Sequence, residues 1–155
     1  SDPARFASIH SNPPGVDTNY PAIIRRRFGE GEVVWVAGPL EMVEYKTHRE
    51  LFIRLIKSLV KEGFSFEVDA PESVEVTMFH QQENRRYIVN LLNFQQELPN
   101  IPISDIKLRI KTEDKTFSKV VILPEEVSLN FESREGYLEV GIPRLDTFLM
   151  LGIHY

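Results

Sequence analysis

The last 85 or so residues of the chain form short segments in which apolar and polar side chains alternate. Successive side chains of a strand point to opposite faces, so this period of two indicates strands with one buried face. Turn sequences such as Thr112-Glu113-Asp114 and Pro124-Glu125-Glu126 separate the segments. We therefore expect an antiparallel β-sandwich of about seven strands and no helix after Pro71. The expected strands are Val74–His80, Arg86–Phe94, Ile103–Ile110, Phe117–Leu123, Val127–Phe131, Tyr137–Ile142 and Thr147–Ile153.

The region before Pro71 has a different pattern. Residues 22–28 and 32–37 predict two strands, and Gly29-Glu30-Gly31 between them predicts the turn of an antiparallel hairpin. Trp35 lies within the apolar run Val33-Val34-Trp35-Val36, which favours a place in the core. Phe64 to Val68 is a further short strand candidate.

Between Tyr45 and Lys61, apolar residues recur at spacings of three and four, which predicts one amphipathic helix that packs against the hairpin. Thr47 with Glu50 has the spacing of a capping box, and Gly63 is the expected stop. The expected fold class is α+β and mostly β. We expect two domains, a partial α/β domain over 1–69 and a β-sandwich over 70–155.

Composition excludes several classes of protein. The 155 residues contain no cysteine, which removes disulfides, zinc ribbons, iron–sulfur clusters and a cysteine nucleophile. A net charge of −5 gives no electrostatic reason to expect nucleic acid. No apolar stretch approaches the roughly 20 residues that cross a bilayer, and residues 1–5 resemble no signal peptide. We expect no membrane partner and favour a cytoplasmic location.

No catalytic, cofactor-binding or metal-binding residues are predicted. A glycosidase needs two facing carboxyls, one of them in an apolar setting. The acidic residues instead lie in turns or on polar strand faces, where surface charge is the favoured interpretation. They are Glu30, Glu32, Glu41, Glu44, Asp69, Glu72, Glu75, Glu83, Asp105 and Asp114.

Histidine and aromatic residues give only weak signals. The four histidines are dispersed, without the i, i+4 spacing of a helical metal site; they are His10, His48, His80 and His154. His10 lies in a polar loop, where a structural hydrogen bond is favoured over general-base work. Arg85-Arg86-Tyr87 could form a stacking platform for a sugar or a base. Tyr20, Tyr45, Phe94 and Tyr155 are weaker binding candidates.

Several segments, in order, resemble the C-terminal region of β-galactosidases of glycoside hydrolase family 42. Residues 6–15, 19–24 and 29–40 are similar to the end of the trimerisation domain, which is amidotransferase-like. Residues 70–76, 86–94 and 141–145 are similar to the C-terminal β domain. One departure is Asn90-Leu91, where relatives usually have His-Leu, so that side chain's role does not carry over.

This resemblance implies a non-catalytic part of a glycoside hydrolase, because the catalytic glutamates of such enzymes belong to a preceding (β/α)8 barrel. The implied role is assembly and packing against that barrel, with the barrel and further copies of the chain as partners. It implies no cofactor. Two alternatives stay open: a carbohydrate-binding β-sandwich module and a general protein-interaction domain.

Overall fold

The computed structural model describes residues 19–42, 45–97 and 99–155, which divide into two compact units at Gly63 and Phe64. The fold is α+β and mostly β, as expected. The division falls before the boundary expected at 69/70, because β3 (Phe66–Asp69) pairs with β6 of the second unit. His10 and Glu44 lie outside the described residues.

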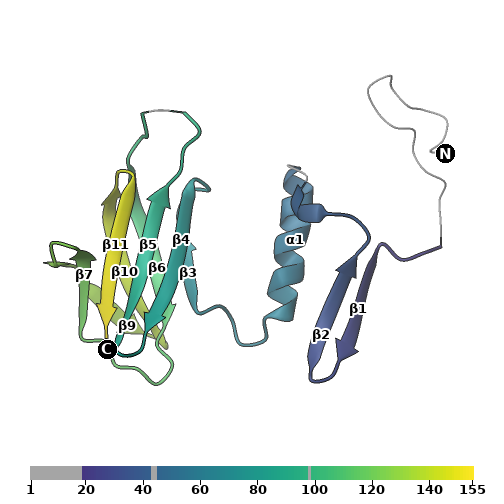
Figure 1. Ribbon diagram of the computed structural model, residues 1–155, viewed down its shortest axis with the longest axis horizontal. Coiled ribbons are helices and arrows are strands. Elements are labelled where there is room, and N and C mark those ends of the chain that lie inside the picture. The colour runs from purple at the N-terminus through teal and green to yellow at the C-terminus, as the bar shows by residue number, and fades with distance from the viewer. Residues whose placement is uncertain (1–18, 43–44, 98) are drawn as a thin grey trace. The chain divides into compact units, whose positions relative to one another are not determined.

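The first unit contains a hairpin of β1 (Ile23–Phe28) and β2 (Gly31–Val36), followed by a short 3-10 helix η2 (Leu40–Met42) and α1 (Lys46–Leu59) (Figure 1). Gly29 has a φ of +58°, a backbone conformation that glycine adopts without strain, so the predicted turn is confirmed. Arg25 links strand to helix, because one of its terminal amino groups donates to the carbonyl oxygen of Ser58 at 3.1 Å.

The predicted ends of the helix were wrong. Tyr45, not Thr47, is the N-cap residue, and no side chain caps the helix. The helix ends at Leu59, because Val60 already has extended backbone angles. Gly63 lies beyond this end. Its φ of +79° is a conformation that glycine adopts without strain, and the chain turns there before the second unit begins.

The second unit is a sandwich of two antiparallel sheets (Figure 1). The four-stranded sheet has the order β3-β6-β10-β9 and the five-stranded sheet the order β4-β5-β11-β7-β8. The strands are β4 (Val74–Gln81), β5 (Arg86–Asn93), β6 (Ile103–Lys111), β7 (Lys119–Leu123), β8 (Val127–Ser128), β9 (Phe131–Arg134), β10 (Tyr137–Leu145) and β11 (Phe148–His154).

The core of the sandwich consists of the apolar side chains that alternate with polar ones along the strands, as the sequence predicts. Ile106, Leu108 and Ile110 of β6 are buried, while the residues between them face outwards. Leu151 and Ile153 of β11 contribute to the same core from the opposite sheet. Burial of such side chains is the main stabilising term of a small β domain.

Two predictions about the sandwich strands were wrong. Residues 127–131 are not one strand: β8 pairs with β7 in one sheet, and β9 pairs with β10 in the other. The backbone amide of Leu129 donates to the Val120 carbonyl at the crossing between the sheets. The strand expected over Tyr137–Ile142 does not end at Ile142, because β10 continues through Pro143 and Arg144 to Leu145.

Candidate functional site

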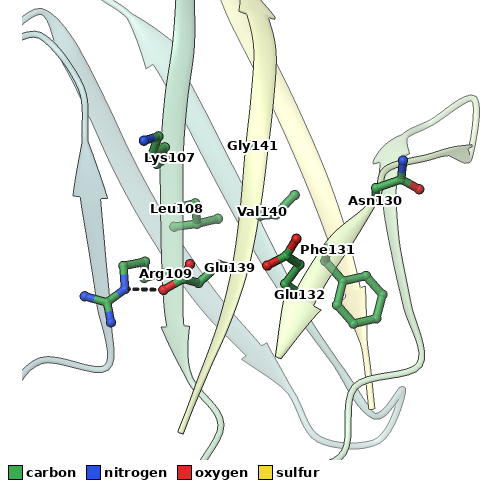
Figure 2. Close-up of a pocket in the computed structure, with 9 residues that line it drawn as sticks. All are labelled: Lys107, Leu108, Arg109, Asn130, Phe131, Glu132, Glu139, Val140 and Gly141. Carbon is green, nitrogen blue, oxygen red and sulfur yellow. Dashed lines mark hydrogen bonds and ion pairs between the residues drawn. The ribbon is translucent and has the colours of Figure 1, made fainter. Parts of the chain in front are cut away.

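A groove lies on the outer face of the four-stranded sheet, beside the point where β9 begins (Figure 2). Its volume is about 470 Å³. The groove forms because β9 begins at Phe131, which pairs with Val140 of β10. From Gly141 onwards, β10 therefore has no β9 residue beside it. The residues that line it are Lys107, Leu108, Arg109, Asn130, Phe131, Glu132, Glu139, Val140 and Gly141, of which Leu108 and Val140 belong to the buried core.

Arg109 organises the charges of this groove. Its Nε donates to Glu139 Oε1 at 2.9 Å, and one terminal amino group donates to Glu67 Oε2 at 3.1 Å. The guanidinium also lies over the Tyr137 ring, 4.3 Å from its centroid, within the range of a cation–π contact. Because these partners come from β3 and β10, Arg109 ties three strands together on the surface.

Gly141 leaves part of the groove floor without a side chain. It pairs with Lys107 across the sheet, so both positions face outwards. A Cβ placed on Gly141 would meet no atom within 4 Å. The space above this glycine is therefore open enough for a side chain or a ligand.

The arrangement of Glu132 and Glu139 does not resemble a catalytic pair of carboxyls. They face each other across β9 and β10. A general acid needs an apolar setting that keeps its proton, whereas Glu139 is ion-paired with Arg109 and 41% of its side chain is exposed. The groove is lined by hydrogen-bond donors and acceptors. They include two basic and two acidic side chains, whose charges cancel.

A second cavity, of about 440 Å³, lies near an aromatic cluster in the same unit. His80 Nε2 and Tyr155 Oη are 2.7 Å apart, and the His80 ring stacks on Tyr87 with centroids 4.6 Å apart. Lys115 donates to Glu113 at 3.0 Å, which lowers the pKa of Glu113 and raises that of Lys115. These rings cover one another, so the cluster serves packing.

The aromatic binding candidates differ in exposure. Tyr87 is buried, so Arg85-Arg86-Tyr87 does not form the stacking platform that the sequence left open. Tyr20, Tyr45 and Phe94 are exposed, and Tyr155 is partly buried in the aromatic cluster.

Trp35 is not in a core, contrary to expectation, because 53% of its surface is exposed. It pairs with Ile24 on one face of the hairpin, and both side chains face away from the partly buried Val34 and Val36. None of the described residues from 19 to 63 is buried. The apolar run favoured burial, but the described residues of this unit leave Trp35 exposed.

The acidic residues that the sequence assigned to the surface are exposed wherever the structure describes them, except Glu32. Glu32 is partly buried and accepts a 2.6 Å hydrogen bond from Arg25, which lowers the pKa of its carboxyl. Among the described histidines, His48 belongs to the first unit, whereas His80 and His154 belong to the second. No group of three or more His, Asp or Glu side chains in the described part of the chain could hold a metal ion.

Sequence reasoning missed the groove, although a signal was present. Alternate residues of β10 point outwards, namely Tyr137, Glu139 and Gly141. A glycine therefore occupies a surface position where a polar side chain is usual. A glycine at an outward strand position marks a place of close approach. The partner strand β9 could not be placed from sequence, because residues 127–131 read as one strand.

The described architecture is a hairpin and helix followed by a two-sheet antiparallel sandwich. One solved structure with this fold is Alpha-L-fucosidase isoenzyme 2 from Paenibacillus thiaminolyticus, at a TM-score of 0.71 and 19% sequence identity. The match covers 98% of this chain and 24% of that chain, so it includes residues of both units and about a quarter of the fucosidase. At this identity the likeness concerns the fold. The sequence matches no protein-family model and no curated protein.

No helix in the described part of the chain is long and apolar enough to cross a membrane.

Proposed function

We propose that the chain is a non-catalytic C-terminal region of a glycoside hydrolase, which supports assembly and packs against a catalytic (β/α)8 barrel. The observation that carries the proposal is the fold match to one quarter of a fucosidase chain across nearly all of this chain. The ordered sequence segments that resemble family 42 β-galactosidases support the same class of enzyme and a position in its C-terminal region.

The exposed apolar surface of the first unit is consistent with this role. Trp35, Ile24, Phe52 and Ile56 are exposed large apolar side chains on the hairpin and the helix. Exposed apolar surface of this kind marks contact with another protein surface. In the proposal, the rest of the parent enzyme and further copies of it provide that cover, in line with the trimerisation role that the sequence resemblance implies.

Two measurements test the proposal. The purified chain is expected to release no nitrophenol from nitrophenyl α-L-fucoside or β-D-galactoside, and hydrolysis at an enzyme-like rate would overturn the non-catalytic role. The gene upstream of the Ser1 codon is expected to encode a (β/α)8 glycosidase domain. A reading frame without such a domain would instead favour a general protein-interaction domain.

The groove at Gly141 favours a second candidate function, binding of a neutral saccharide. Sugar hydroxyls both donate and accept hydrogen bonds, and the balanced set of Lys107, Arg109, Glu132 and Glu139 offers both. Calorimetric titration with galactose, fucose and their oligosaccharides tests this function. Gly141→Trp fills the open space and should abolish any binding, while Ile101→Trp, in an exposed loop, should leave it unchanged.

A further inference from the structure

The outer faces of the two sheets each carry a row of polar side chains, and the two rows differ in charge. The row on the four-stranded sheet consists of Glu67, Arg109, Glu139 and Glu132. Its one basic group is ion-paired with two of the carboxylates. The row on the five-stranded sheet crosses β4, β5, β11 and β7 (Figure 1) and consists of Gln81, Arg86, His154 and Lys119. This second row, here called the basic row, has no carboxylate, although the chain has a net charge of −5.

The register places the basic side chains of this row side by side. His154 of β11 pairs with Arg86 of β5 and with Lys119 of β7. Neighbouring strands lie about 4.7–4.9 Å apart, so the backbones at Arg86 and Lys119 are roughly 9–10 Å apart. Both side chains are long enough to meet one ligand that lies above His154. Because like charges close together in a sheet are destabilising, an anion between them is expected to stabilise the row.

Arg86 is held in a fixed orientation by a neutral partner. Its Nε donates to Gln81 Oε1 at 2.7 Å, and the residue is partly buried. Arg25, Arg109 and Arg144 differ, since each of them donates to a carboxylate. In the described part of the chain, neither terminal amino group of Arg86 has a hydrogen-bond or ion-pair partner. Both groups therefore remain available to an oxyanion, which a guanidinium binds through two parallel hydrogen bonds.

Lys119 has a carboxylate partner that a bound anion can replace. Its Nζ donates to Glu126 Oε2 at 3.2 Å, and Glu126 lies in the turn that follows β7, outside the basic row. The two side chains are 45% and 64% exposed. Exposed ion pairs of this kind contribute little to stability. Lys119 is therefore free to exchange Glu126 for an anion beside Arg86.

The His154 ring leans away from the position between these two cations. A Cβ placed on Gly152, two residues earlier on the same face of β11, would lie 3.4 Å from His154 Nε2. The imidazole thus extends along its own strand, over a residue that has no side chain. An anion can therefore approach Arg86 and Lys119 without displacement of this ring.

The row next to the basic row gives the site an apolar side. Its residues are Phe79, Ile88, Gly152 and Val121. Ile88 and Val121 are buried, whereas 58% of the Phe79 surface is exposed. Phe79 lies two residues before Gln81, on the same face of β4. An organic group attached to the anion can pack on this ring, so the surface favours an organic ester over a free ion.

The number of oxygen atoms in the anion selects its class. The two terminal amino groups of Arg86 take two oxygens, and Lys119, on the far side of His154, needs a third. A carboxylate has only two oxygens, whereas a phosphate or sulfate ester has three that are free. We propose that the basic row binds the phosphate or sulfate group of a small organic ligand. Gln81 is a positioning residue of this site, because it acts through Arg86.

This site goes beyond the proposed function, since it lies on the other sheet from the Gly141 groove and requires neither a catalytic barrel nor a neutral sugar. Amide NMR spectra of the whole chain test it in titrations at pH 7 and constant ionic strength. The probes are phenyl phosphate, phenyl sulfate, inorganic phosphate and benzoate. We expect saturable shifts at the Arg86 side-chain N–H and at the backbone amides of His154 and Lys119.

The comparison of probes identifies the ligand class. At least one phenyl ester should bind about threefold or more tightly than inorganic phosphate and than benzoate. If inorganic phosphate binds as tightly as both esters, the assignment to an organic ligand is wrong. If benzoate binds as tightly as the esters, the three-oxygen contact is wrong. Shifts that do not saturate, or that spread over the whole surface, mean counter-ion screening only and would overturn the site.

Substitutions locate the contact. Arg86→Gln should weaken binding of the tighter phenyl ester about tenfold or more, as for loss of hydrogen bonds to a charged group. Arg134→Gln, at an exposed position on β9, changes the net charge equally and should leave the affinity unchanged. Equal weakening by both variants would show an effect of net charge alone and would overturn the site. Chemical shifts of the core amides report whether each variant is folded.

Glu126→Gln gives a test with the opposite sign. It removes the carboxylate that competes for Lys119, so the ester should bind about two- to threefold more tightly. This result stays decisive even if Arg86→Gln does not fold, because Glu126 lies in an exposed turn. Unchanged or weaker binding by Glu126→Gln would overturn the role of Lys119. None of these results depends on whether a glycosidase barrel exists in the parent gene.

Discussion

His80 Nε2 and Tyr155 Oη lie 2.7 Å apart, which joins strand β4 to the residue that follows β11. The backbone amide of Tyr155 also donates to the Arg85 carbonyl at 3.0 Å. Tyr155 is therefore held by its side chain and by its backbone, and it closes one end of the five-stranded sheet.

Removal of the Tyr155 hydroxyl should weaken this closure. We expect Tyr155→Phe to lower the free energy of unfolding by about 1 kcal/mol, the usual value of one such hydrogen bond. Urea denaturation measures the change. Tyr20→Phe, at a fully exposed position, is the matched control and should have no effect. A Tyr155→Phe variant as stable as the parent chain would show that the hydrogen bond adds nothing to stability.

Leu151 tests the position of the core. It is fully buried between the two sheets, so we expect Leu151→Ala to cost about 2–5 kcal/mol through lost burial and a residual cavity. Ile101→Ala, in an exposed loop, should change stability by less than about 0.5 kcal/mol. Similar losses at both positions in chemical denaturation would contradict the described core.

Asn93 holds the loop between β5 and β6. Its Nδ2 donates to the carbonyls of Ile101 and Asp146, at 3.0 and 2.8 Å, and its Oδ1 accepts from Gln95. Asn93→Asp removes both donors from a buried position, so we expect a loss of about 2–4 kcal/mol. Hydrogen exchange should also become faster around residue 101. Asn84→Asp, in an exposed turn, should change neither quantity.

The pH dependence of one ion pair can be followed directly. Arg144 donates two hydrogen bonds to Asp146 Oδ1, and these lower the pKa of the Asp146 carboxyl below its ordinary value. Because the folded-state pKa lies below the unfolded one, the stabilisation is complete above the unfolded pKa. It is lost as the pH falls through the folded pKa, in the range below about pH 4.

Carbon-detected NMR titration measures this shift. Arg144→Gln should raise the pKa of Asp146 towards its ordinary value, whereas Arg134→Gln, on β9, should leave it unchanged. If Asp146 titrates at the same pH in the parent chain and in Arg144→Gln, the ion pair does not persist in solution.

The two units should differ when they are separated. All buried residues of the core cluster belong to the second unit, so residues 64–155 alone should unfold cooperatively. The isolated segment of residues 1–63 should give no cooperative transition, since none of its described residues is buried. Calorimetry of both fragments tests this difference. A cooperative transition of the first segment would mean that it forms a core of its own.

Much of the sandwich was predictable because alternation reports directly on burial. Ile106, Leu108 and Ile110 were assigned to one face from sequence, and the structure buries all of them. Pairing between distant strands leaves no such local signal. The sequence therefore could not show that residues 127–134 change sheets, or that Gly141 faces outwards beside an open strand edge.

Local pattern also could not determine which apolar faces are covered. Val33-Val34-Trp35-Val36 has the composition of a buried strand, but Trp35 is exposed because the described unit supplies no layer over it. The cap of α1 was missed for a related reason. Capping residues are favoured by weak local energies, and the backbone places Tyr45 at that position without a side-chain cap.

Because the segment from Val127 to Arg134 belongs to both sheets, it forms a short covalent link between the layers, one of several places where the chain crosses from one sheet to the other. A pulling force that peels β9 from β10 is transmitted along Leu129 to the β7–β8 ladder. The sandwich should therefore rupture under load as one mechanical element, with no intermediate in which one sheet has opened and the other remains intact.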